Sequence, residues 1–142
     1  MENTGKYKFV AVINRQLPSG VALNAIAHMS AGIVASASPE IKEQMCFIDF
    51  IDKNEIQYKS ISANSLIVLS GKPGEIKKVY SHLIEKGILI VSFLETMTND
   101  TYKEQLERTR NTPTEDVLFY GIMIFGEKAE IDPITRKLSL WK

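Results

Sequence analysis

Mostly apolar runs of strand length alternate along the chain with stretches in which apolar residues recur at helical spacing. The run 7–13 is rich in β-branched and aromatic residues and contains no glycine or proline, which predicts a central strand buried on both faces. Comparable runs at 65–70, 88–94 and 118–126 predict three further core strands. The pattern therefore predicts one sheet as the centre of the molecule.

The first predicted strand is followed by a turn and a helix. Residues 17–20 turn the chain, and Ser19 is the expected N-cap of a helix over 21–36. Because this helix is rich in alanine, we expect it to pack closely against the sheet. Ser38 and Pro39 then predict the cap and first turn of a second, short helix.

An amphipathic helix over 75–87 links the strands at 65–70 and 88–94. Its apolar residues share one face, and Gly87 is the expected C-terminal stop. A strand, a crossover helix and a second strand form a βαβ unit, in which the two strands run parallel. The sheet is therefore predicted to be at least partly parallel.

A hairpin is predicted between the short second helix and the strand at 65–70. The segments 46–52 and 56–62 are rich in strand-forming residues, and 53–55 is the expected loop. Cys46 begins the first of these segments without a basic neighbour, so it is interpreted as a core residue rather than a nucleophile. As the single cysteine, it has no partner for an internal disulfide.

Two later segments are predicted at the periphery. Residues 95–117 are rich in threonine, asparagine and charge, and predict a surface excursion that contains a helix at 101–110. The C-terminal tail carries the apolar residues Leu138, Leu140 and Trp141. We expect this tail to dock, either on the body of the same chain or in a homodimer against a second copy.

Composition narrows the class of protein. A chain of 142 residues with 44% hydrophobic residues has the size of one domain, 1–142. Its 17 basic and 17 acidic residues balance, so bulk charge gives no attraction to nucleic acid or to a membrane, and tRNA is disfavoured as a partner. The start of the chain is not of the secretory kind, and the apolar stretches fall short of the roughly 20 residues that span a bilayer. We therefore expect a cytoplasmic protein.

Most common reaction chemistries lack their sequence signals. His28 and His82 lie far apart, without a cysteine or second histidine at ligand spacing, so no metal is expected. Residues 70–74, Ser-Gly-Lys-Pro-Gly, lack the spacing of a phosphate loop, and no nucleophile-elbow motif is present. We expect no cofactor, and we interpret His82 as a partly exposed structural residue.

One helix nevertheless carries candidate chemistry. Asn24 and His28 are four residues apart and share a helical face, and the first strand delivers Asn14 and Arg15 to the start of that helix. Such strand ends and helix starts form the usual binding crevice of open α/β sheets. There Arg15 can hold an anion, Asn24 can orient a water, and His28 can act as a general base. The alternative is structural, a buried Asn–His pair joined by a hydrogen bond.

Three segments together resemble a known fold. They are VAVINRQLPSGVALNAIAHMSAG, GILIVSFLET and FYGIMIFGEKAEIDPITRKLSL, which in this order are similar to the type II peptidyl-tRNA hydrolases. The Leu-Pro-x-Gly turn, the Asn-x-x-x-His helix and the closing glycine-containing strand resemble more closely the domain-of-unknown-function family two thousand. The resemblance implies a three-layer α/β/α domain with a central mixed sheet.

The resemblance also implies a site, but an altered one. Type II hydrolases cleave the ester between a peptide and its tRNA, and their first helix carries a glycine-lysine start, a glutamine and a histidine. Aligned on Gly20 and His28, this chain has Val21 in place of the lysine and Ala25 in place of the glutamine. Valine cannot neutralise a phosphate or stabilise an oxyanion. The resemblance therefore supports the family's fold for this chain more strongly than the family's activity.

The family's aspartate and threonine after a later core segment have approximate counterparts here. Glu95, Thr96 and Thr98 offer a carboxylate and hydroxyls without the family's glycine turn. The expected catalytic residues are therefore His28, Glu95 and Asn24. The expected substrate-binding residues are Asn14 and Arg15, at the end of the first strand, together with Thr96 and Thr98.

Three functions remain open at this point. The first is a hydrolase for an acyl or phosphorylated small molecule, with His28 as base and Glu95 as orienting carboxylate. The second is a non-catalytic module that binds a small molecule or a protein in the same crevice. The third is a genuine peptidyl-tRNA hydrolase.

Overall fold

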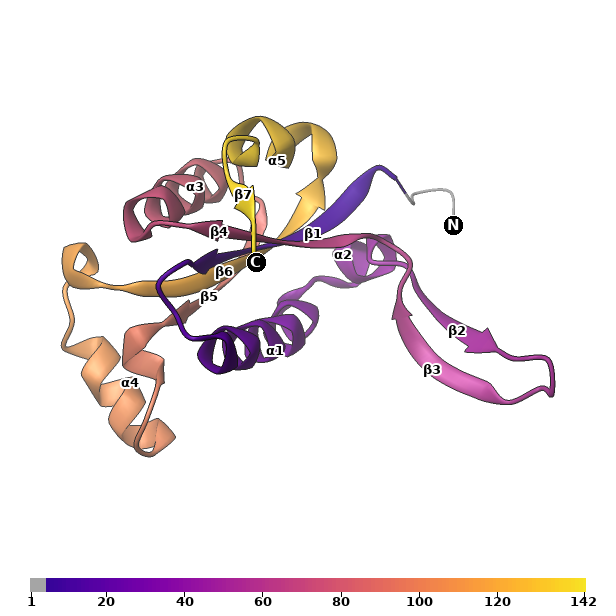
Figure 1. The fold of residues 1–142 in the computed structure, drawn as a ribbon, viewed down its shortest axis with the longest axis horizontal. Helices are drawn as coiled ribbons and strands as arrows, with labels where there is room; N and C mark the ends of the chain where they lie inside the picture. The colour runs from indigo at the N-terminus through magenta and orange to yellow at the C-terminus, as the bar shows by residue number, and fades with distance from the viewer. Residues whose placement is uncertain (1–4) are drawn as a thin grey trace.

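A five-stranded mixed sheet forms the centre of the computed structural model, which describes residues 5–142 (Figure 1). Residues 1–4, part of the segment judged not to be secretory, lie outside the described residues. The strands of this sheet are β1 (Tyr7–Asn14), β4 (Leu66–Gly71), β5 (Leu89–Leu94), β6 (Phe119–Glu127) and β7 (Ser139–Leu140). They lie in the order β5-β6-β1-β4-β7, and only β1 and β4 are parallel neighbours. The expected α/β class with a mixed sheet is confirmed.

Helices cover both faces of the sheet. They are α1 (Ser19–Ser36), α2 (Pro39–Gln44), α3 (Pro73–Glu85), α4 (Tyr102–Arg110) and α5 (Lys128–Thr135). Figure 1 shows α1 on one face and α3 with α5 on the other, while α4 lies beside the edge strand β5. Short 3-10 turns, Glu95–Met97 and Thr114–Asp116, flank α4.

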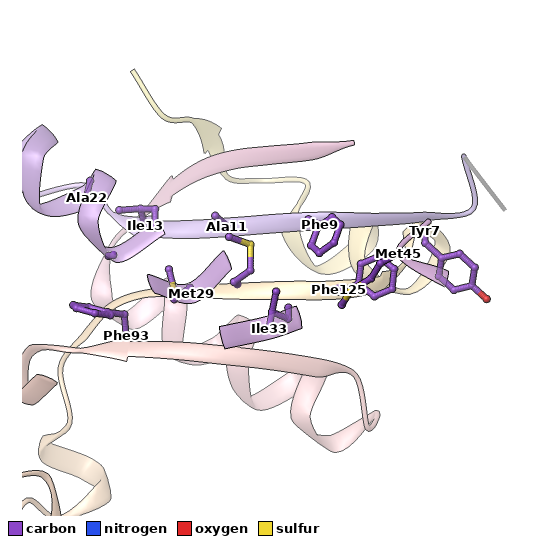
Figure 2. Packing of buried hydrophobic residues seen from close by; sticks show 12 residues of the cluster. Tyr7, Phe9, Ala11, Ile13, Ala22, Met29, Ile33, Met45, Phe93 and Phe125 are labelled. Atoms are coloured by element: carbon purple, nitrogen blue, oxygen red, sulfur yellow. The ribbon is translucent and has the colours of Figure 1, made fainter. Parts of the chain in front are cut away.

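The central strand β1 supplies both halves of the core, because all eight of its residues are buried. Phe9 and Ile13 point into the cluster under α1, where Phe9 packs on Phe125 (Figure 2). Val10 and Val12 point to the opposite side, into the cluster under α3 and α5. The run 7–13, in which Lys8 is the only charged residue, therefore forms a strand that is covered on both faces.

Close packing of α1 on the sheet depends on two glycines. A Cβ at Gly121 in β6 would lie 2.7 Å from Cδ1 of Ile13 and 3.1 Å from Cε of Met29. A Cβ at Gly32 would lie 3.3 Å from a methyl group of Val91. The expectation of a close helix–sheet contact is therefore confirmed.

Helix α1 also has the length and composition of a membrane-spanning helix. The prediction that no stretch reaches this size is therefore wrong for α1. Here, however, Ala22, Ala25, Met29 and Ile33 are buried in the core of the domain. A core helix passes the same test of length and composition, so this finding alone is weak evidence of a membrane span.

Local details around the first two helices differ in part from the expectation. Ser19 is not the N-cap of α1, because Pro18 occupies the cap position and no side chain caps the helix. The expected cap of α2 is confirmed, since Ser38 Oγ accepts the amide of Ile41 at 3.2 Å. Cys46 is not a core residue: it is half-buried with φ 54°, whereas its neighbour Met45 is fully buried.

The strands β4 and β5 run in the same direction, as expected for a crossover through α3, but they are not neighbours. Strand β5 pairs antiparallel with β6, and β6 pairs antiparallel with β1. The nine-residue β6 is apolar and largely buried, which suits an inner position, whereas β5 is shorter and half-buried. The sheet therefore has β5 at one edge.

The predicted hairpin and the docking tail are both present. Strands β2 (Phe47–Ile51) and β3 (Gln57–Ser62) pair antiparallel and project away from the body of the molecule (Figure 1). The tail docks on its own chain: β7 pairs with β4, and the amide of Trp141 donates to the carbonyl of Val68 at 2.9 Å.

Candidate functional site

A groove of about 800 Å³ lies between α1, the edge strand β5 and the segment that leads into α4. Its walls combine apolar side chains with amides and hydroxyls. Aspartate, glutamate, lysine and arginine are absent from the lining. The lining residues are Gly20, Val21, Asn24, His28, Met29, Val91, Ser92, Phe93, Met97, Thr98, Asn99, Tyr102, Gln105, Leu106 and Thr109.

Asn24 and His28 form the polar part of the α1 wall. Both residues are exposed, and within residues 5–142 neither side chain has a hydrogen-bond partner. The imidazole of His28 lies against Phe93, with ring centroids 5.6 Å apart and planes inclined by 32°. The alternative of a buried Asn–His pair is therefore wrong, because both polar groups face solvent in the groove.

The floor of the groove is the outer side of β5. Successive strand residues point to opposite faces, yet Val91, Ser92 and Phe93 all line the groove, so the groove reaches the edge of the strand itself. In the described part of the chain, β5 pairs only with β6. An edge strand directs alternate N–H and C=O groups away from the sheet. The floor therefore offers backbone hydrogen-bonding groups beside apolar side chains.

The second wall is held in place by Arg108, which does not itself line the groove. Its Nη2 donates to the carbonyls of Thr98 at 2.6 Å and Thr96 at 3.2 Å. Its Nη1 forms an ion pair with Oδ2 of Asp100 at 2.9 Å. One guanidinium thus ties the segment before α4 to the helix, as its fork of donors allows.

Two further contacts shape this wall. Thr109 Oγ1 donates to the carbonyl of Gln105 at 2.7 Å and lies 2.8 Å from the hydroxyl of Thr96. Gln105 Nε2 donates to the carbonyl of Asn99 at 2.7 Å. Asn99 and Asp100 both have a left-handed backbone, with φ 60° and 59°, and asparagine and aspartate tolerate this conformation better than most residues.

The structure brings together three of the residues expected in the site. Asn24, His28 and Thr98 line the groove, whereas Asn14, Arg15, Glu95 and Thr96 do not. For Asn14 and Arg15 the reason is the strand order. Because β6 lies between β1 and β5, the end of β1 is separated from the groove at the edge of the sheet.

The four expected residues outside the groove have other surroundings. Asn14 is 3% exposed, donates to the carbonyl of Phe119 at 3.4 Å and accepts the amide of Gln16 at 3.0 Å, so it supports the turn after β1. The side chains of Arg15 and Glu95 are exposed outside the groove. Thr96 is buried.

Four lining residues of α4 were not expected from the sequence. Tyr102, Gln105, Leu106 and Thr109 occur at positions i, i+3, i+4 and i+7 and therefore share one face of the helix. This spacing was visible in the sequence. The high content of polar and charged residues in the segment concealed it, because only two of the four residues are apolar or aromatic.

The described residues offer no cluster of side chains that could bind a metal ion. Residues 5–142 contain no group of three or more histidine, cysteine, aspartate or glutamate side chains placed to hold an ion. The groove itself contributes a single imidazole, from His28.

Comparison with solved structures identifies the same fold elsewhere. Eight solved chains match, among them a protein of unknown function, Atu0240, from Agrobacterium tumefaciens strain C58. It is 18% identical, with a TM-score of 0.77 over 95% of this chain and 97% of its own, which shows a shared fold.

Comparison with protein-family models identifies a family whose description gives no activity. A search of the curated proteins finds no match. The family model described as "Protein of unknown function (DUF2000)" matches residues 7–142. The chain therefore belongs to the DUF2000 family.

Proposed function

We propose that the groove between α1, β5 and α4 binds a neutral ligand in which an apolar group lies next to amide or hydroxyl groups. The observation that carries this proposal is a lining without acidic or basic side chains apart from the imidazole of His28. Ligand sites are typically apolar clefts of about 300–1,000 Å³ with a few placed polar groups. The groove, at about 800 Å³, fits this description.

The lining supplies complementary groups for such a ligand. Val21, Phe93 and Leu106 offer apolar surface, whereas Asn24 and His28 offer side-chain donors and acceptors without partners in residues 5–142. The free edge of β5 adds main-chain groups that an extended amide can pair with. A peptide-like ligand would therefore satisfy all three parts of the lining.

The same lining weighs against anionic ligands. Val21 lines the groove at the position where the type II peptidyl-tRNA hydrolases, which this chain resembles, carry a lysine. Arg15 lies outside the groove. A phosphate would therefore lose its hydration without gaining a charged partner. Phosphorylated substrates and peptidyl-tRNA are disfavoured on this ground.

Binding can be tested with N-acetyl-leucinamide as a neutral probe and phenyl phosphate as an anionic one, followed by NMR of the labelled protein. We expect N-acetyl-leucinamide to shift the amides of Phe93 and Gln105, and phenyl phosphate to leave them in place. Asn24→Ala and His28→Ala should each weaken binding about fivefold, the effect of one hydrogen bond of roughly 1 kcal/mol.

The matched control is His82→Ala, which removes an exposed histidine from α3 on the other face of the sheet. It should bind the probe as the unchanged protein does. Preferential binding of phenyl phosphate, or equal affinity in all three variants, would contradict the proposal.

A second candidate function is hydrolysis of an uncharged acyl ester, favoured by the exposed imidazole in the groove and by the resemblance to type II peptidyl-tRNA hydrolases. His28 would take a proton from water as the hydroxide forms a bond to the acyl carbon. The bond to the leaving oxygen then breaks, and the imidazolium returns its proton to that oxygen. Asn24, one helical turn away, would position the water or the carbonyl.

The hydrolase candidate has a separate readout. If it is correct, N-acetyl-leucine methyl ester should be hydrolysed, and His28→Ala should lower the rate by a factor of about 10²–10⁴, as for loss of a general base. Glu95→Gln should leave the rate unchanged, because Glu95 does not line the groove. Binding of N-acetyl-leucinamide without hydrolysis of the methyl ester would favour a non-catalytic binding module over a hydrolase.

A further inference from the structure

We propose that the ligand of the groove is a short, uncharged, extended segment of a polypeptide, which joins the sheet as an added strand beside β5. The proposal rests on the proposed function, because the site is the same groove, and it adds the conformation and the main-chain partners of the ligand. The groove lies along the free edge of β5. A peptide that adds to such an edge gains affinity from main-chain hydrogen bonds and specificity from its alternate side chains.

The main-chain groups of Ser92 point away from the sheet. The amide of Leu94 donates to Sδ of Met97 at 3.4 Å, on the side away from β6. The next amide, of Glu95, donates at 3.0 Å to the carbonyl of Leu118, which directly precedes β6. Main-chain groups alternate in direction along a strand, so Ser92 shares the outward direction of Leu94. The bulge in the β5–β6 pairing does not change this alternation, because its extra residue belongs to β6.

Strand β5 lacks the features that usually protect an edge. Charged side chains, proline and bulges in the edge strand prevent pairing with other chains. The sequence of β5, Leu-Ile-Val-Ser-Phe-Leu, contains neither a charged residue nor proline. In the part of the chain that the structure describes, β5 pairs with β6 alone. An apolar edge of this kind is a template for an added strand.

Helix α1 runs beside β5 in the opposite direction, which places its polar residues along the path of an added strand. The ring of His28 lies against Phe93, and a Cβ at Gly32 would lie 3.3 Å from Val91. Four residues along α1 therefore correspond to two along β5. Four helical residues span about 6 Å and two strand residues about 6.6 Å. Asn24 and His28 are thus spaced to contact alternate residues of a peptide that pairs with β5.

The size of the groove fits a short strand. A strand residue takes up about 160 Å³, since strands rise about 3.3 Å per residue, lie about 4.8 Å apart and pack in layers about 10 Å apart. The groove, at about 800 Å³, therefore holds roughly five extended residues, close to the six of β5 itself. A second copy fits less well, because its own β5 lies between its own α1 and α4.

The probe for this proposal is the uncharged pentapeptide N-acetyl-Thr-Val-Leu-Val-Thr-amide, followed by NMR of the labelled full chain. It should bind at least about tenfold more tightly than N-acetyl-leucinamide, because its main chain forms additional hydrogen bonds with β5. Hydrogen exchange of the Ser92 amide should slow at least about tenfold in the complex. Exchange of the Phe93 amide, which points toward β6, should change less than that of Ser92.

Two N-methylated forms of the pentapeptide separate strand pairing from recognition of side chains. One carries the methyl group on the leucine nitrogen, and the other carries methyl groups on both valine nitrogens. Because alternate amides of a strand point to its partner, one form should bind more than about tenfold more weakly than the parent peptide. The other form should stay within about threefold of the parent peptide, since its methyl groups point away from β5.

A substitution in β5 tests the same hydrogen bonds from the protein side. Ser92→Pro removes the outward N–H, and proline is tolerated in edge strands where the N–H faces away from the sheet. The matched variant Ser92→Ala removes the hydroxyl and keeps the N–H. Ser92→Pro should weaken pentapeptide binding at least about tenfold more than Ser92→Ala does. Circular dichroism checks the fold, and the methylated peptides test the unchanged protein even if Ser92→Pro does not fold.

The failure of this proposal differs from the failure of the proposed function. Binding of N-acetyl-leucinamide without tighter binding of the pentapeptide would overturn the added strand and leave the proposed function in place. Equal effects of the two methylated forms would do the same. Absence of binding of both probes would overturn both proposals. Protection of the Ser92 amide that rises with protein concentration in the absence of peptide would assign the edge to a second copy, against the proposal.

Discussion

At the scale of single residues, exposure separates Asn24 and His28 from the polar residues that support the fold. Asn14 and Thr96 are buried and hydrogen-bonded, so their polarity is explained by the turn and the wall that they support. Asn24 and His28 have no such partners within residues 5–142 and lie at the mouth of the groove. Hydrogen bonds that stabilise the fold therefore do not account for these two polar side chains on a helix of alanines, valines and isoleucines.

Gly121 is the residue whose substitution should disturb the core most directly. A methyl group there would lie 2.7 Å from Cδ1 of Ile13, 3.1 Å from Cε of Met29 and 3.1 Å from the carbonyl oxygen of Val12, so the side chains of Ile13 and Met29 and the neighbouring backbone would have to shift. We expect Gly121→Ala to destabilise the protein by about 1–3 kcal/mol, the usual effect of overpacking, in urea unfolding.

Gly74→Ala is the matched control, because a Cβ at that position in α3 meets no atom within 4 Å. Alanine in a helix is favoured over glycine, so this variant should be as stable as the original or more stable by about 0.5–1 kcal/mol. A similar loss in both variants would show that close packing at Gly121 is not the cause.

At the scale of elements, α4 is the least firmly attached wall of the groove and depends on Arg108. Arg108→Ala removes two hydrogen bonds to backbone carbonyls and an ion pair with Asp100. We expect a loss of about 1–3 kcal/mol in thermal unfolding and a weaker affinity for the neutral probe, because Thr98 and Asn99 lose their support. Arg110→Ala, which removes an exposed arginine from the same helix, should change neither measurement.

The tip of the hairpin carries a pH-sensitive turn. The amide of Ile56, the hydroxyl of Tyr58 and the amide of Asn54 all donate to the Asp52 carboxylate, in that order of effect, and lower its pKa below 3.8. A lowered pKa means that the charged form stabilises the turn above the ordinary pKa, and that this contribution is lost as pH falls through the lower value. An NMR titration of the Asp52 carboxyl should show the shift, and Tyr58→Phe should reduce it.

Elements with one strong local signal could be predicted from the sequence. The run 7–13 has no breaker, and Ser38 followed by Pro39 is a sufficient cap signal, so β1 and the start of α2 were placed correctly. Ser19 failed as a cap because Pro18 already holds the extended backbone of that position, and a serine in the next position cannot serve.

Arrangements that depend on distant pairs could not be predicted in this way. Nothing local to 65–70 or 88–94 reveals that β1 and β6 lie between these strands, since strand order is decided by pairing across the whole chain. That order removed Asn14 and Arg15 from the site. Asn24 and His28 nevertheless line one groove together, because their spacing of four residues is local to helix α1, and Thr98 joins them from the segment after β5.

At the scale of the whole molecule, the sheet and the hairpin should behave as two units of different stability. Strands β1 and β6 are covered on both faces, whereas β2 and β3 are covered on neither in a single copy. Local opening costs less where few apolar contacts are buried, so amides of 47–62 should exchange with solvent far faster than those of 7–14 in a dilute sample.

Hydrogen exchange followed by mass spectrometry of the full chain measures both segments. Equal exchange rates in 47–62 and 7–14 would contradict the expectation that the sheet and the hairpin differ in stability.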